Sequence, residues 1–102
     1  MEIKVLWTQT ALNNLEDIFE YHKFKASVVV ARNLVKKLVK TTILLQNSPE
    51  MGRKEDFLRH RKFDYRFIVE GNYKIIYWIE DNYIKIATVF DTRQHPDKIK
   101  NI

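Results

Sequence analysis

Cationic side chains are the residues of this chain whose number and spacing could do chemistry. The formal net charge is +5. The excess lies in residues 23–66, where twelve Lys and Arg side chains stand against four Asp and Glu. A concentration of one charge attracts nucleic acid or an acidic protein, and it is equally the composition of a solvated face. The candidate nucleic-acid or target-binding residues are a helical stripe and a loop cluster: Arg32, Lys36, Lys40, Arg59, Arg61 and Lys62.

Metal and thiol chemistry have little support in the sequence. The chain has no cysteine, which excludes disulfides, thiolate catalysis and cysteine-ligated zinc. It has three scattered histidines. His22 continues an apolar helical stripe, and His60 lies among basic loop residues. We therefore expect no metal and no other cofactor.

Length and composition describe one compact domain over residues 1–102. The chain is 45% hydrophobic and 30% charged, with two glycines and two prolines. At this size it builds one core, which excludes a two-domain enzyme with an interdomain cleft. No apolar run approaches the roughly 18 residues of a membrane span, and the amino terminus has no secretory pattern. We expect a soluble, cytoplasmic protein with no membrane partner.

Helical periodicity runs through two segments. Thr8 or Thr10 can cap a first helix over about residues 9–23, with apolar residues at spacings of three and four. Ser27 can cap a second helix that stops near Asn47. The link between them, Lys23 to Ser27, is so short that the helices must pack antiparallel. The following stretch, residues 49–60, has neither helical nor strand period and predicts a loop.

Alternating hydrophobicity predicts four strands. The first contains Ile3, Val5 and Trp7, and the other three follow the loop, over residues 63–69, 73–79 and 84–90. Two-residue turns at 71–72 and 81–82, Gly-Asn and Asp-Asn, connect the last three strands, since these residues tolerate positive φ. Beyond residue 91, Pro96 predicts a tail or a short terminal turn.

The predicted fold is α+β: an N-terminal strand, an antiparallel helical hairpin and a three-stranded antiparallel meander. We expect the first strand to pair beside the meander, so that the hairpin packs on one face of a four-stranded sheet. The other face would then be free for function. Rings on the last strands could stack nucleotides there, although they are more typical of strand packing: Tyr73, Tyr77, Trp78 and Tyr83.

A co-linear set of short motifs covers nearly the whole chain: Trp7-Thr8-x-x-Ala11-x-x-x-Leu15-x-x-Ile18-x-x-Tyr21, Pro49-x-x-Gly52, Tyr65-Arg66, Gly71-Asn72-Tyr73-Lys74-Ile75-x-Tyr77, and Val89-Phe90-Asp91-Thr92-Arg93 before Pro96. This set resembles the RelE/ParE superfamily of bacterial type II toxins. The resemblance implies a growth-inhibiting toxin of a plasmid-stabilisation or addiction system. It also implies a cognate antitoxin, whose extended or helical segment wraps the toxin in a hetero-oligomer.

The activities of this superfamily divide in two. RelE-like members cut mRNA in the ribosomal A site, whereas ParE-like members inhibit DNA gyrase. The basic cluster of the mRNA-cleaving members maps here onto Arg66, Lys74 and Arg93, with His95 as the candidate acid–base group. Cleavage by the RNA 2′-OH needs such groups to move protons and to neutralise phosphate charge. Lys74 could lie across the hairpin from Arg66, an arrangement that costs stability unless an anion or a carboxylate such as Asp91 lies between the two cations.

The catalytic set is incomplete in this chain. Ile68 stands where mRNA-cleaving members carry a second lysine, and their carboxyl-terminal tyrosine or histidine has no clear counterpart. We therefore favour a ParE-like gyrase inhibitor that is not an enzyme. The alternatives are a RelE-like mRNA endoribonuclease acting at the ribosome and a non-toxic nucleic-acid or partner-binding domain.

Overall fold

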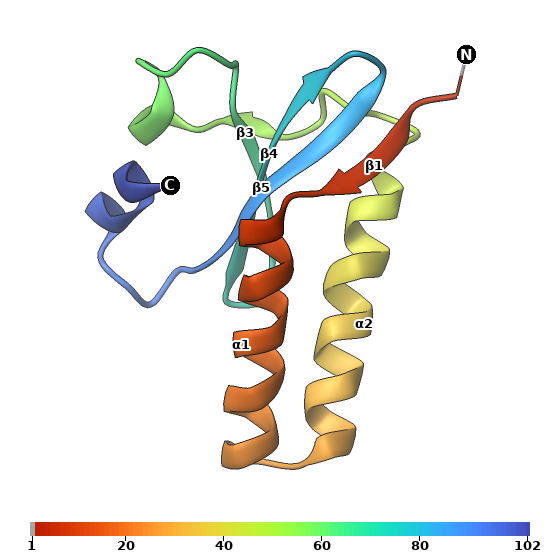
Figure 1. Ribbon diagram of the computed structural model, residues 1–102, viewed down its shortest axis with the longest axis vertical. Coiled ribbons are helices and arrows are strands. Elements are labelled where there is room, and N and C mark those ends of the chain that lie inside the picture. Colours follow the sequence, from red (N-terminus) through yellow and green to blue (C-terminus); the bar gives the residue numbers. More distant parts are fainter. Residues whose placement is uncertain (1) are drawn as a thin grey trace.

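The computed structural model, which describes residues 2–102, contains the predicted helical hairpin. Helix α1 spans Gln9–Lys25 and α2 spans Val28–Leu44. Both predicted caps are present: the Thr8 hydroxyl accepts a hydrogen bond from the Ala11 amide at 3.2 Å, and Ser27 accepts one from the Val30 amide at 3.1 Å. Two residues separate the helices, which therefore lie antiparallel and side by side (Figure 1).

The sheet has five strands, one more than predicted. The expected four are β1 (Lys4–Trp7), β3 (Arg66–Glu70), β4 (Tyr73–Glu80) and β5 (Tyr83–Asp91). The fifth, β2 (Arg53–Lys54), comes from the predicted loop and pairs with β3 at the edge of the sheet. Two residues are too few for alternation to reveal. The strand order is β1-β5-β4-β3-β2, with β1 parallel to β5 and the other pairs antiparallel.

The two predicted turns set the register of the meander. Gly71 has a φ of +59°, and Asp81 and Asn82 have φ values of +50° and +67°. Across the first turn Glu70 pairs with Tyr73, and across the second Glu80 pairs with Tyr83. The register between β4 and β5 shifts once, between Ile76 and Tyr77. This irregularity re-aims the end of β5 that follows it, which lies beside α1.

The helical hairpin covers one face of the sheet, as predicted. Its inward-facing side chains pack against those of β4 and β5 in a core whose residues are buried or partly buried. The fully buried residues of this core are Ala11, Leu38, Leu45, Ile75, Tyr77, Ile84 and Ile86.

The opposite face of the sheet is also covered, which corrects the expectation that it is free. Two short helices lie on it, η1 (Asp56–Leu58) and η2 (Pro96–Asn101). They insert Leu58 and Ile99, 2% and 1% exposed, into a second cluster with Ile76 and Ala87. Figure 1 shows η1 and η2 near each other and away from the helical hairpin. The apolar side chains on both faces of β4 require this second layer.

No helix within residues 2–102 has the length and apolar character needed to cross a membrane.

Candidate functional site

The predicted binding cations fall on two separate surfaces. Arg32, Lys36 and Lys40 are exposed on α2, and none of them forms an ion pair with another described residue. The loop cluster lies around η1, which covers the other face of the sheet. There Arg61 donates hydrogen bonds to the backbone oxygens of Lys100 and Ile102, so it fastens η2. Arg59, Arg61 and Lys62 line a hollow of about 330 Å³, whose lining also includes Lys54 and three carboxylates: Glu55, Asp56 and Asp64.

Arg66 lies on the helix-side face of the sheet. Its Nη1 donates to the carbonyl oxygens of Gly52 at 2.9 Å and Glu50 at 3.2 Å, and its Nη2 is 3.9 Å from the Asp64 carboxylate. One-fifth of the side chain is exposed. Its donors therefore hold the loop before β2 against the sheet.

Lys74 lies on the opposite face. Its Nζ donates to Glu55 Oε1 at 2.9 Å and stands 4.1 Å from the centre of the Phe67 ring. The Glu55 side chain is 2% exposed and that of Lys74 is 18% exposed. The pair is nearly out of water, so each charge depends on the other.

The strand register separates these two cations, contrary to the expected arrangement. Arg66 pairs with Tyr77, and Lys74 pairs with Val69. Because side chains alternate across a strand, Arg66 shares the face of Tyr77, while Lys74 shares the face of Phe67 and Ile76. Asp91 lies next to neither cation, because it pairs with Tyr73 on β4 and binds Arg93.

Arg93 and Asp91 form a two-pronged ion pair at the end of β5. The guanidinium donates from Nε to Asp91 Oδ1 at 2.9 Å and from Nη2 to Oδ2 at 2.8 Å. The Arg93 amide also donates to Oδ1 at 2.9 Å. These hydrogen bonds lower the pKa of Asp91 and raise that of Arg93, so both groups are charged at neutral pH.

His95 begins the terminal helix. Its Nδ1 accepts a hydrogen bond from the Asp97 amide at 3.1 Å, which makes it the N-cap of η2. The side chain is 71% exposed. In this position Nδ1 is occupied by the backbone, and His95 lies apart from the groups that bind Arg66 and Lys74.

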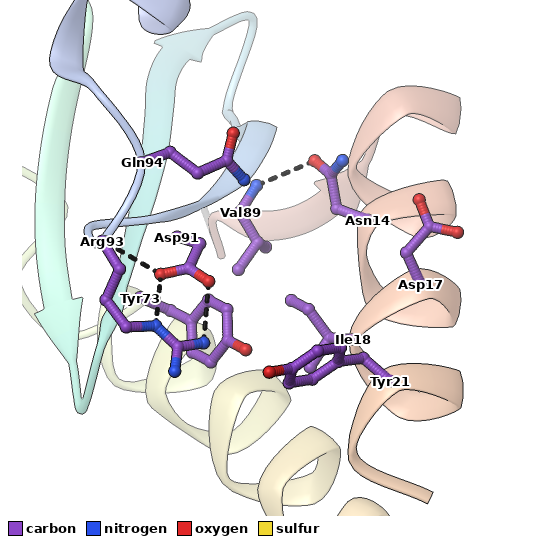
Figure 2. Close-up of a pocket in the computed structure, with 9 residues that line it drawn as sticks. All are labelled: Asn14, Asp17, Ile18, Tyr21, Tyr73, Val89, Asp91, Arg93 and Gln94. Carbon is purple, nitrogen blue, oxygen red and sulfur yellow. Dashed lines mark hydrogen bonds and ion pairs between the residues drawn. The ribbon is translucent and has the colours of Figure 1, made fainter. Parts of the chain in front are cut away.

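A cleft of about 560 Å³ opens between α1 and the end of β5 (Figure 2). Of the predicted site residues, Arg93 alone lines it. Figure 2 shows the Asp91–Arg93 pair on the sheet side, with the Tyr21 ring extending towards it from α1, where Asp17 also lines the cleft. At its upper end the Asn14 amide oxygen accepts from the Thr88 hydroxyl at 2.7 Å and the Val89 amide at 3.0 Å, fixing α1 to β5.

Of the α1 residues that line this cleft, Ile18 and Tyr21 belong to the motifs of the family resemblance, whereas the amphipathic pattern assigns Asn14 and Asp17 only to a solvated helix face. Asn14, Asp17 and Tyr21 recur at spacings of three and four, which places them on one face of the helix. That spacing is the signal that could have found Asn14 and Asp17.

Two titratable side chains of the cleft, Tyr73 and Asp91, have shifted pKa values. Burial, followed by the nearby Asp91 charge, raises the pKa of Tyr73 above 10.0, while the pKa of Asp91 is lowered below 3.8. Neither group exchanges its proton near pH 7. The Tyr73 hydroxyl is also engaged, 2.9 Å from His22 Nε2. Among the described residues, no three acidic or histidine side chains gather as a metal site.

Comparison with solved structures identifies the fold. The chain superimposes on a protein of the chromosomal ParDE toxin–antitoxin system from P. aeruginosa with a TM-score of 0.73, at 15% identity over 88% of this chain and 96% of the other. It matches a chain of the RelBE2 toxin–antitoxin complex from Mycobacterium tuberculosis with a TM-score of 0.65, at 18% identity over 89% and 99%. The fold is therefore that of the RelE/ParE toxins.

The sequence comparison is more specific. The family model of the ParE toxin of the type II toxin–antitoxin system parDE matches residues 5–96. No curated protein sequence matches the chain. The protein belongs to the ParE toxin family.

Proposed function

We propose that this toxin arrests growth by binding DNA gyrase and that it has no hydrolytic activity. The family to which the chain belongs supports this target. The observation that carries the proposal is the engagement of the candidate catalytic cations with the protein itself. Arg66 binds two loop carbonyls, Lys74 binds buried Glu55 on the other face, and Arg93 binds Asp91. Cleavage of mRNA requires cations that converge on the reacting phosphate, because negative charge builds up there in the transition state.

We further propose a hetero-oligomer with a cognate antitoxin that carries an acidic segment. The solved relatives belong to ParDE and RelBE2 toxin–antitoxin systems. The excess of Lys and Arg in residues 23–66 would attract such a segment. Complex formation should weaken as salt rises from low to physiological ionic strength, because the Debye length shrinks from about 30 Å to about 8 Å. Affinity that does not change with salt would contradict the acidic partner.

The target is tested by two assays on the same purified toxin. We expect the toxin to inhibit DNA supercoiling by gyrase and to leave mRNA uncut on translating ribosomes. The result that would overturn the proposal is mRNA cleavage at codon positions with supercoiling intact. Loss of those cuts in Arg93→Ala would then assign the ribonuclease alternative to this arginine. An antitoxin-bound sample is the control for both assays.

A further inference from the structure

The tip of the helical hairpin exposes an aromatic side chain almost completely. Phe24, in the last turn of α1, is 85% exposed, the highest value among the large apolar side chains that the structure describes. Val29 and Val28, at the start of α2, are 60% and 42% exposed, and Tyr21 is 47% exposed. Apolar groups gathered at one end of a domain mark an interaction site.

Hydrogen bonds order the backbone at the tip. The Ala26 amide donates to the His22 carbonyl at 2.9 Å, and Ser27 caps α2 immediately afterwards. Only two residues join the helices, and the tip is the part of the hairpin farthest from the sheet (Figure 1). A partner that binds Phe24 therefore has little backbone to order.

Positive charge lies beside this apolar tip. In residues 20–32, from the last turns of α1 to the first turns of α2, Lys23, Lys25 and Arg32 stand against one acid, Glu20. Lys23 pairs with that acid at 3.1 Å. Lys25 forms no ion pair with a described residue, and its Nζ lies 6.0 Å from the centre of the Phe24 ring. A partner that buries the Phe24 ring therefore contacts cationic side chains next to that ring.

We propose that the hairpin tip is the docking point for the toxin's target, and that Phe24 enters an apolar pocket rimmed by acidic side chains on that protein. An aromatic anchor inside a polar rim is the usual anatomy of a protein–protein hot spot. Nucleic acid is a poorer fit, because the branched side chains of Val28 and Val29 beside Phe24 offer no flat face on which further bases could stack. The identity of the target as gyrase rests on the proposed function, whereas the role of the tip does not.

Two tip variants and two matched controls test the docking point. Phe24→Ala removes the anchor, and Leu44→Ala removes a side chain that is 57% exposed at the other end of α2. Lys25→Glu reverses a rim charge, and Lys98→Glu reverses one on η2. We expect the tip variants to lose at least about tenfold in growth arrest and in gyrase inhibition. The controls should stay within about twofold, and all four should keep the wild-type unfolding midpoint. Phe24→Ala, which leaves the charge unchanged, should also keep wild-type antitoxin affinity.

The outcomes separate this proposal from the proposed function. Tip variants that arrest growth as strongly as wild type would overturn the docking point. So would tip variants that keep toxicity but escape the antitoxin, since the tip would then be an antitoxin site. Binding of wild type, but not Phe24→Ala, to anionic phospholipid vesicles would assign the tip to a membrane instead. If wild type arrests growth without inhibiting gyrase, the gyrase target fails, while loss of arrest in Phe24→Ala still supports the tip.

Discussion

The Tyr77 hydroxyl accepts a hydrogen bond from the Gly52 amide at 3.0 Å and donates one to the Pro49 carbonyl at 2.7 Å. Tyr77 is fully buried in the helix-side core. Arg66 binds the same loop by donating hydrogen bonds to the carbonyl oxygens of Glu50 and Gly52. The Pro-x-x-Gly and Tyr-Arg motifs that carried the family resemblance thus meet in one structural assembly, which fixes the loop before β2.

Gly52→Ala should destabilise the protein by about 1–3 kcal/mol, the usual cost of overpacking. A Cβ at this position would stand 2.6 Å from Tyr77 Oη and 2.8 Å from the Phe67 carbonyl oxygen, and the latter is backbone that cannot rotate away. Urea unfolding measures the effect. Gly71→Asn is the matched control: nothing lies within 4 Å of a Cβ there, and asparagine tolerates its φ of +59°. Equal losses in both variants would contradict the steric cause.

Tyr77→Phe should cost about 1–3 kcal/mol of unfolding free energy, because the Gly52 amide and the Pro49 carbonyl lose a buried partner. The Tyr83→Phe control removes the hydroxyl of a side chain that is 38% exposed, and it should change stability by less than about 0.5 kcal/mol. Amide hydrogen exchange offers a local readout. We expect Gly52 to exchange faster in Tyr77→Phe, and unchanged exchange would show that the hydrogen bond does not hold the loop.

Lys74→Met should destabilise the protein by about 3–5 kcal/mol, because it leaves the Glu55 charge buried without its partner. The double variant Lys74→Met/Glu55→Met removes both charges and should recover most of that loss. Growth arrest is the informative second readout. Arrest that returns in the double variant assigns Lys74 a structural role, whereas a folded double variant without toxicity would support a catalytic lysine.

The Asp91–Arg93 pair gives the folded state a pH dependence of defined sign. Because the guanidinium lowers the pKa of Asp91 below 3.8, the unfolded chain binds more protons here than the folded one. The stabilisation is complete above the ordinary pKa and is lost as pH falls through the lowered value. The difference in unfolding free energy between wild type and Arg93→Gln should be constant at about pH 5–7 and should shrink towards zero below about pH 4. A gap that widens in acid would contradict the pair, and Arg59→Gln should show no such trend.

Local physics made much of the fold predictable. The caps at Thr8 and Ser27 act within three residues, and the turns at Gly71 and Asp81–Asn82 need only residues that accept positive φ. The two-residue turn at 71–72 also fixes the pairing of Glu70 with Tyr73, and hence of Val69 with Lys74. The separation of Arg66 from Lys74 therefore follows from the sequence. Arg66 lies three residues before Val69, and side chains three residues apart on a strand point to opposite faces of the sheet. The expectation that the two cations lie opposite each other was therefore wrong.

Tertiary structure alone decided which groups these residues bind. Nothing in the sequence pairs Lys74 with Glu55, nineteen residues away. Nothing local places α1 against the end of β5 to form the cleft, or folds η1 and η2 over the second face of the sheet. The physical reason is range: capping, turn and period act within a few residues, whereas burial and charge pairing depend on which distant segments share a surface. The sequence determined the elements and the family, and the packing of those elements determined the partners of Arg66, Lys74 and Arg93.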